Sequence, residues 1–206
     1  MITEADARVL EPGSTVVLVA GGHITPLARD TLSARRVAVI SYGAADATSS
    51  LAPPAEIRTV AIAGDHTSLS IKAAIVTHLR ARGLAAHDLG TATNDPVDYP
   101  DTAAAAARAV ARGEADAGIA IDGAGLGSAI AANKIPGARA AMCVNETLAR
   151  YARQHNGANV LTLGSTLLTT EQALAIVDVF VATPMREARY IRRLAKIREL
   201  ETGPRT

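Results

Sequence analysis

From residue 58 onward, short apolar segments alternate with helical segments along this 206-residue chain. The apolar segments have the length of strands, and the connections between strands and helices are short. This alternation predicts right-handed crossovers and an α/β fold in which a five-stranded parallel sheet is covered by helices on both faces. The expected strands are 58–65, 85–90, 115–122, 138–144 and 158–164, and the expected helices are 68–83, 100–114, a helix starting at 128, 146–156 and 169–182.

Composition and charge exclude several classes of partner. Hydrophobic residues make up 49% of the chain and aromatic residues 2%, which suits a parallel sheet packed against Ala-rich helices. With a net charge of +1 and dispersed Lys and Arg, the chain offers no basic face or aromatic platform for nucleic acid. No apolar run approaches the roughly 20 residues of a membrane span, so we expect a cytoplasmic protein that does not contact the membrane. A single cysteine, Cys143, excludes an internal disulfide and a cysteine-cluster metal site.

The chain divides at a stretch that lacks apolar periodicity. Residues 44–57 are rich in Ala, Ser and Thr and contain a Pro pair, so they are predicted to be a linker. Residues 1–43 predict a small α/β module with the order helix, strand, helix, strand. A module of this size is marginal for independent folding, so a partner or oligomerisation is expected to stabilise it. Residues 58–206 form the main predicted domain, which ends in an Arg-rich helical arm.

The segment 117–134 contains the most informative carboxylate. Asp122 closes an apolar strand, and Gly123, Gly125 and Gly127 follow it, which lets the backbone bend tightly and approach a ligand. An ordinary helix N-cap is an equally good interpretation, because Asp is favoured at that position. Asp65 and His66 follow the first strand of the main domain. Because parallel strands end at one edge of the sheet, these residues are expected to share a cleft with Asp122.

The sequence does not match the motifs by which proteins commonly bind organic cofactors or metals. The glycine turn is G-x-G-x-G after the third strand, whereas a dinucleotide fingerprint is G-x-G-x-x-G in the first βαβ unit. No Gly-Lys-Ser/Thr follows the turn, which argues against a P-loop. The other histidines lack a matched spacing to Asp65 and His66, which argues against zinc. The sequence therefore predicts neither an organic cofactor nor a metal.

Several separate motifs follow one another over about residues 58–200: GDHTSLSIK, the DYP of residues 98–100, GAGLGSAIAANK, GARAAMC, RQHNGANVLTLGS and a final R-x-x-x-R. In this order they resemble the ribose-5-phosphate isomerase B and galactose-6-phosphate isomerase family. The resemblance implies a flavodoxin-like three-layer αβα fold without cofactor or metal. It also implies a homodimer, or a dimer of dimers, with two active sites built across the dimer interface.

The resemblance assigns roles around one edge of the sheet. Asp65 would contact the sugar ring or its hydroxyls, and His66 would help to hold the phosphate. Tyr99 would lie near the sugar.

The resemblance also assigns roles to two later motifs. His155 and Asn156 would come from the neighbouring subunit, the histidine to assist ring opening and the asparagine to hold hydroxyls of the open chain. Arg189 and Arg193 lie four residues apart on the last helix and would clamp the phosphate. Without the resemblance, the two arginines would be read as a solvated helix face.

Two departures from the family pattern are clear. Asp122 stands where the family usually has the cysteine of C-G-T-G as the base, and Ala124 replaces its threonine; some members instead have a serine in the turn and a glutamate after it. Asp122 is the only carboxylate in the turn, and burial must make it a stronger base despite the helix N-terminus beside it. Thr166 stands where relatives often carry an arginine of the phosphate site.

The sequence predicts an aldose–ketose isomerase that converts ribose 5-phosphate to ribulose 5-phosphate through an enediolate, with Asp122 as base. The alternatives are a non-catalytic phosphosugar-binding or scaffold protein and an isomerase for another sugar phosphate.

The N-terminal module resembles short terminal modules of enzymes of bacterial microcompartments. This implies shell or cargo proteins as partners and a location inside such a compartment; the alternatives are an oligomerisation appendage and an extra lobe beside the active site.

Overall fold

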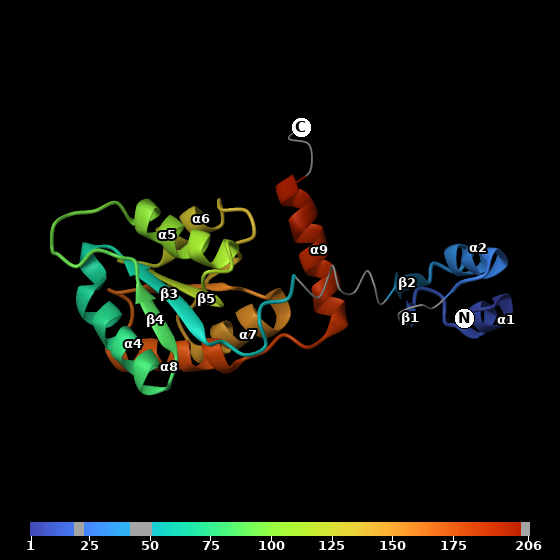
Figure 1. The fold of residues 1–206 in the computed structure, drawn as a ribbon, viewed down its shortest axis with the longest axis horizontal. Helices are drawn as coiled ribbons and strands as arrows, with labels where there is room; N and C mark the ends of the chain where they lie inside the picture. The colour runs from blue at the N-terminus through green and yellow to red at the C-terminus, as the bar shows by residue number, and fades with distance from the viewer. Residues whose placement is uncertain (19–22, 42–50, 203–206) are drawn as a thin grey trace. The chain divides into compact units, whose positions relative to one another are not determined.

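The computed structural model describes residues 1–18, 23–41 and 51–202 (Figure 1). Contacts within the chain divide it into two units, Met1–Leu51 and Ala52–Thr206. The division falls inside the predicted 44–57 linker, of which residues 44–50 lie outside the described ranges.

The second unit is built on a sheet of five parallel strands, as the alternating pattern predicts. The strands have the spatial order β4-β3-β5-β7-β6. In chain order this is 2-1-3-5-4, so the last two strands are exchanged relative to the 2-1-3-4-5 order of flavodoxin. The strands are β3 (Thr59–Gly64), β4 (Ala85–Asp88), β5 (Ala117–Asp122), β6 (Ala140–Met142) and β7 (Val160–Gly164).

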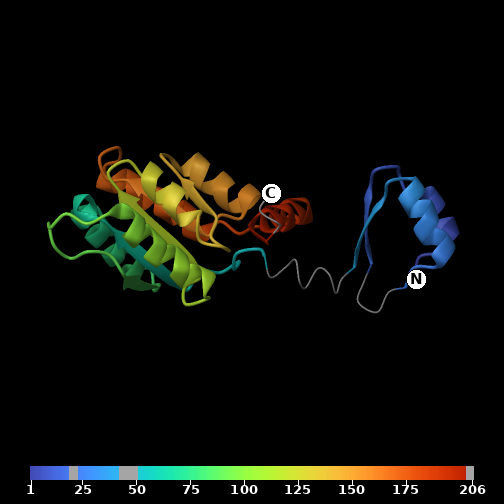
Figure 2. The same cartoon turned by 90° about the horizontal axis from the view of Figure 1, so that it is seen from above.

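Helices cover both faces of this sheet and confirm the predicted three-layer arrangement. Helices α5 and α6 lie on one face, and α4, α7 and α8 lie on the other (Figures 1 and 2). A short 3₁₀ turn, η1 (His66–Ser68), links β3 to α4. The helices are α4 (Leu69–Ala81), α5 (Tyr99–Ala111), α6 (Leu126–Ala132), α7 (Glu146–Asn156) and α8 (Thr170–Ala182).

Residue size alternates along the central strands and differs between the two faces. Ile62, Ile119 and Ile121 are fully buried and belong to the main core with α4, α7 and α8. Ala61 and Gly118 alternate with them on the α5 side, and a Cβ on Gly118 would lie 3.2 Å from Val110 Cγ2. Small residues therefore allow α5 to pack closely, while branched side chains fill the other face.

A fully buried arginine holds the end of α7. The Arg153 guanidinium donates to the carbonyl oxygens of Thr183 (3.2 Å), Ala158 (2.9 Å) and Pro54 (3.1 Å), and it lies 5.2 Å from the centre of the Phe180 ring. Burial lowers the pKa of Arg153 to about 10. The hydrogen bonds satisfy a charge that would otherwise be costly to bury, and they fix the helix end that carries His155 and Asn156.

The predicted helical arm is α9 (Ala188–Thr202). Tyr190 and Leu194 are buried, and the left-handed Gly157 that ends α7 leaves room for Leu194, since a Cβ there would lie 2.8 Å from Leu194 Cδ1. The first half of α9 is thus packed on the end of α7.

The first unit has the predicted order of helix, strand, helix, strand. Thr3 forms a capping box with Asp6, and Thr25 caps the second helix, which starts at a proline. Strands β1 and β2 pair in parallel, and the small core contains Ala7, Ala28, Leu32 and Val37. Within the described ranges, no helix of either unit has the length and apolar character needed to cross a membrane. The elements are α1 (Glu4–Val9), β1 (Thr15–Leu18), α2 (Pro26–Ala34) and β2 (Ala38–Ser41).

Candidate active site

Two buried residues with carboxylate side chains, Asp65 and Asp122, lie at the carboxyl ends of β3 and β5. Strand β3 lies between β4 and β5, so the chain crosses from one side of β3 to the other, with α4 and α5 on opposite faces. This is the switch point at which ligands bind in open parallel sheets. The Asp65 N–H donates to the Ile121 carbonyl oxygen at 3.1 Å, which places Asp65 directly beside the end of the strand that carries Asp122.

Both oxygens of Asp122 are held by the glycine turn. Asp122 as a whole residue is 4% exposed. Oδ1 accepts the N–H groups of Ala124 (2.9 Å) and Gly125, and Oδ2 accepts the N–H of Ser128 (2.7 Å). Asp122 is therefore buried, as a base at this position requires, but it also has the hydrogen bonds that the helix-cap interpretation predicts. Its role as the base stays a prediction.

The glycines of the turn differ in whether the structure leaves room for a side chain in their place. Gly125 has φ +77°, and a Cβ there would lie 2.8 Å from the Leu163 carbonyl carbon. We expect Gly125→Ala to lower the free energy of unfolding by about 2 kcal/mol or more, through backbone strain and this collision. Gly123→Ala is the matched control, because a Cβ at Gly123 meets nothing within 4 Å. Urea unfolding of both variants measures the difference, and equal midpoints would contradict the expectation.

Asp65 is held through only one of its oxygens. It is 5% exposed, and Oδ1 accepts the N–H of Thr67 (2.9 Å) and the Thr67 hydroxyl (2.6 Å). The Thr67 Oγ1 lies 3.2 Å from Ser165 Oγ, which follows β7. In the described part of the chain, Oδ2 of Asp65 accepts no hydrogen bond.

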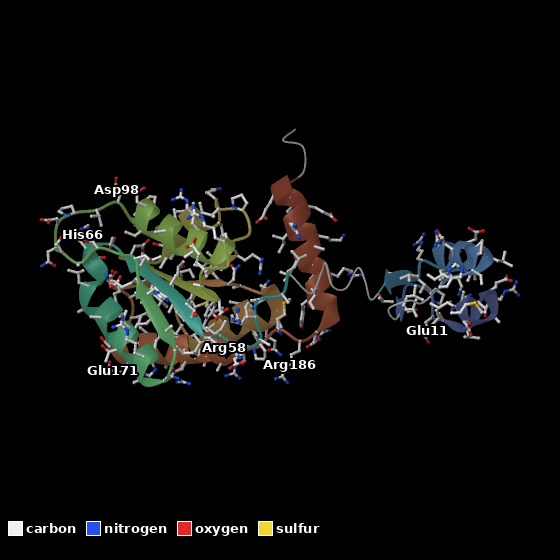
Figure 3. All side chains as sticks on the ribbon, in the orientation of Figure 1. Glu11, Arg58, His66, Asp98, Glu171 and Arg186 are labelled. Atoms are coloured by element: carbon white, nitrogen blue, oxygen red, sulfur yellow. The ribbon has the colours of Figure 1, made fainter. Side chains whose placement is uncertain are left out.

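His66 lies at the same edge with one nitrogen available. The Val97 N–H donates to His66 Nδ1 at 3.3 Å, so a neutral imidazole carries its proton on Nε2. That N–H is a donor suited to a phosphate oxygen. Figure 3 shows His66 and Asp98 at this end of the unit.

Tyr99 packs directly on the glycine turn. It opens α5, is 41% exposed, and lies so close to Gly127 that a Cβ there would be 2.5 Å from Tyr99 Cε2. The turn glycine is thus matched to the ring, and the exposed ring surface is available to a ligand.

Lys72 anchors the loop between β4 and α5, a role that the sequence does not reveal. It is 3% exposed, and Nζ contacts both Asp88 carboxylate oxygens and the Thr91 carbonyl oxygen, each at 2.7 Å. The loop it holds carries Val97 and leads to Tyr99. Its position in the motif GDHTSLSIK could have marked Lys72 as a residue of the site, but only the structure shows which groups it contacts.

The remaining predicted residues lie at the opposite end of the unit. His155 and Asn156 end α7, four residues before β7 begins at its amino end. The His155 ring lies 4.7 Å from both the Tyr151 and Tyr190 rings. Figure 3 shows Arg186, just before α9, far from His66. Within a single chain, His155, Asn156 and the arginines of α9 therefore lie away from Asp65 and Asp122.

Both predicted clamp arginines lie against Tyr190. The guanidinium carbons of Arg189 and Arg193 are 4.7 and 5.5 Å from its ring centre. Arg189 also pairs with Glu187 at 2.6 Å, and this hydrogen-bonded ion pair raises the pKa of Arg189. The two arginines share one side of α9, as their spacing predicts. The aromatic support from Tyr190 was not anticipated, because the aromatic residue is not part of the R-x-x-x-R pattern.

A groove of about 670 Å³ lies at this second end, between α9 and the segment that joins α6 to β6. Asn156, Arg139 and Ile197 are among its lining residues, whereas Asp65 and Asp122 are not. The groove is therefore separate from the two buried carboxylates of the sheet edge, and the one carboxylate among its lining residues in the described part of the chain is that of Glu201.

Thr166 braces the glycine turn. Its hydroxyl donates to the Gly123 carbonyl oxygen at 2.6 Å, and its N–H donates to the same oxygen at 3.0 Å. At the position where relatives often carry an arginine, this chain thus has a short hydroxyl that holds the turn.

Cys143 does not replace the cysteine of the family pattern. It is buried after β6, and burial raises the pKa of its thiol to about 11. Because the thiolate is the reactive form, we expect iodoacetamide to modify native Cys143 at pH 8 at least tenfold more slowly than the urea-unfolded chain. Mass spectrometry of the alkylated protein measures both rates, and equal rates would show that the thiol is accessible and ionised.

These features define a class of protein: a parallel α/β fold in which two buried carboxylates and a histidine donor lie at the switch point of the sheet, the place where such folds bind small molecules. In the described ranges, no three side chains among His, Cys, Asp and Glu gather as a metal site would need. The family described as Ribose/Galactose Isomerase matches residues 60–197, and the chain belongs to that family.

Individual relatives agree with this membership. The chain is 40% identical over 145 residues to ribose-5-phosphate isomerase B of Escherichia coli, which covers 70% of this chain and 97% of the relative. The structure of ribose-5-phosphate isomerase B from Clostridium thermocellum has a TM-score of 0.69 and 44% identity, with 70% of this chain and 97% of that chain covered. The Mycoplasma genitalium enzyme, solved with bound ribulose-5-phosphate, has a TM-score of 0.68 and 39% identity, over 71% and 97% of the two chains.

Proposed function

We propose that this sugar-phosphate isomerase interconverts ribose 5-phosphate and ribulose 5-phosphate. The observation that carries the proposal is the pair of buried carboxylates, Asp65 and Asp122, side by side at the switch point of the sheet. The names of relatives about 40% identical to the chain support the choice of sugar.

The isomerisation only moves protons within the sugar, so it needs no external oxidant or reductant. The aldehyde of the open-chain aldose acidifies the proton on C2, and a carboxylate accepts that proton while the C–H electron pair forms the C1–C2 double bond of an enediolate. A proton moves from O2 to O1, the carboxylate returns its proton to C1, and O2 becomes the carbonyl oxygen of the ketose. Asp122 is the base that the sequence predicts. In that role it would have to release the N–H groups that hold both of its oxygens.

We propose further that the working unit is a homodimer with composite sites. His66 would offer its Nε2–H to the phosphate, and Arg189 and Arg193 of a second copy would supply the opposing charge. His155 and Asn156 of that copy would act on the ring and the open-chain hydroxyls. The support is that one chain holds these two groups at opposite ends.

A panel of pentose, hexose and tetrose phosphates tests the substrate, with unphosphorylated ribose as the matched control. We expect the highest kcat/KM with ribose 5-phosphate, and a loss of about 1,000-fold or more without the phosphate, because several charge-assisted hydrogen bonds are removed. A hexose or tetrose phosphate that reacts faster would overturn the choice of sugar. No reaction with any phosphate would favour the non-catalytic alternative.

Residues 1–43 lie outside the matched family region, 60–197. Their association with microcompartment shell or cargo proteins, and a location inside such a compartment, stay predictions that rest on the sequence resemblance.

A further inference from the structure

We propose that Asp65, rather than Asp122, is the catalytic base that moves the proton between C1 and C2, and that Asp122 is the support of the glycine turn. This inference rests on the proposed isomerase function. It assigns the base to the other member of the carboxylate pair, because the two side chains differ in which of their oxygens are free.

Oδ2 of Asp65 is the open oxygen at this edge. It accepts no hydrogen bond in the described part of the chain. The buried side-chain nitrogen and oxygen atoms without a partner in that part are Ser14 Oγ and Ser128 Oγ. Oδ2 of Asp65 is not among these atoms. It therefore retains solvent-accessible surface, although Asp65 as a whole is only 5% exposed. An unpaired lone pair at the opening of a buried carboxylate is what a general base presents to its substrate.

A chain of hydroxyl groups orients Asp65. The Thr67 hydroxyl has one hydrogen, and it is donated to Asp65 Oδ1 at 2.6 Å. The contact of 3.2 Å between Thr67 Oγ1 and Ser165 Oγ must therefore be donated by Ser165. This order, from Ser165 to Thr67 to Asp65, holds Oδ1 and leaves Oδ2 directed elsewhere. It also links the ends of β3 and β7 across the end of β5.

Asp122 has the opposite arrangement. Three backbone N–H groups bind its two oxygens, so its negative charge is stabilised and its lone pairs are directed at the chain itself. To remove a proton from carbon it would have to leave three buried N–H groups without an acceptor. Asp65 needs no such exchange, since its two Thr67 bonds remain in place when Oδ2 takes the proton.

The experiment uses ribulose 5-phosphate as substrate in D₂O. With O5 esterified, this ketose cannot close a furanose ring, so exchange of its C1 proton reports proton transfer without ring opening. The variants are Asp65→Asn, which keeps an oxygen for Thr67, and Asp122→Ser, which keeps an oxygen for the turn but is no carboxylate base. NMR measures the C1 exchange rate, and binding of a linear phosphorylated hydroxamate that mimics the enediolate verifies that each variant still has a folded site.

We expect Asp65→Asn to lower the exchange rate by about 100- to 10,000-fold and to retain hydroxamate binding. Asp122→Ser is expected to lower the exchange rate about tenfold, because the turn loses part of its hydrogen bonding, but far less than Asp65→Asn does. Retained exchange in Asp65→Asn would overturn the proposal and would assign Asp65 to ring opening if conversion of ribose 5-phosphate is lost. Loss of exchange in Asp122→Ser with hydroxamate still bound would also overturn it. Absence of exchange in the wild-type protein would instead refute the proposed function.

A second, independent test uses Thr67, the residue that positions the Asp65 carboxylate. Thr67→Val removes the hydroxyl that holds Oδ1, and we expect kcat to fall about tenfold with KM nearly unchanged, because the base is less well oriented. Thr67→Ser keeps the hydroxyl and is expected to restore kcat. Equal kcat values for Thr67→Val and Thr67→Ser would contradict the orienting role.

Discussion

Mixing two inactive variants, Asp65→Asn and the double variant Arg189→Ala/Arg193→Ala, is expected to restore about a quarter of the wild-type activity. In a random 1:1 mixture half of the dimers are mixed, and each mixed dimer has one site in which both contributions are intact. The reason is the separation seen in the structure: Asp65 lies at the carboxyl ends of the strands, whereas both arginines lie on α9 at the other end. Co-expression and a steady-state assay with ribose 5-phosphate measure the recovery.

The matched control combines Asp65→Asn with His66→Ala. Both residues come from the edge of the same chain, so every site in a mixed dimer carries one defect, and no recovery is expected. Recovery in the control, or none with the arginine variant, would show that each chain builds its own complete site.

Replacing Asp122 by alanine is expected to lower the free energy of unfolding by about 3 kcal/mol or more. The carboxylate is the acceptor for the N–H groups of Ala124, Gly125 and Ser128, and each buried group left without an acceptor costs about 1–3 kcal/mol. Urea unfolding measures the loss. Asp122→Asn retains Oδ1 for two of the groups and is expected to lose about half as much. An Asp122→Ala variant as stable as the wild type would show that the turn does not need this carboxylate.

Much of the fold could be predicted from the sequence, because apolar strands and amphipathic helices alternate with short connections. The run 117–121 is apolar on both faces, which predicts a buried strand, and β5 is buried along its whole length in the middle of the sheet. The exchange of β6 and β7 could not be predicted. Both strands are short and apolar, and crossovers of similar length fit either order.

The site could be predicted only to the level of the sheet edge. Strand ends place Asp65, His66 and Asp122 together, but the sequence cannot tell a capping Asp from a free one, since that depends on which N–H groups its oxygens face. Thr67 and Ser165 went unassigned for the same reason, although both follow strand ends. The spacing of Arg189 and Arg193 fixes a shared helix side, yet not the position of α9 at the far end of the unit.

A crystal structure of the chain with ribulose 5-phosphate bound would show which carboxylate faces the reacting carbons. We expect C1 and C2 to lie about 3–3.5 Å from Asp65 Oδ2, with the phosphate between His66 and the two α9 arginines of a second copy. A sugar bound in the groove beside Arg139 and Asn156, with its reacting carbons away from both carboxylates, would contradict it.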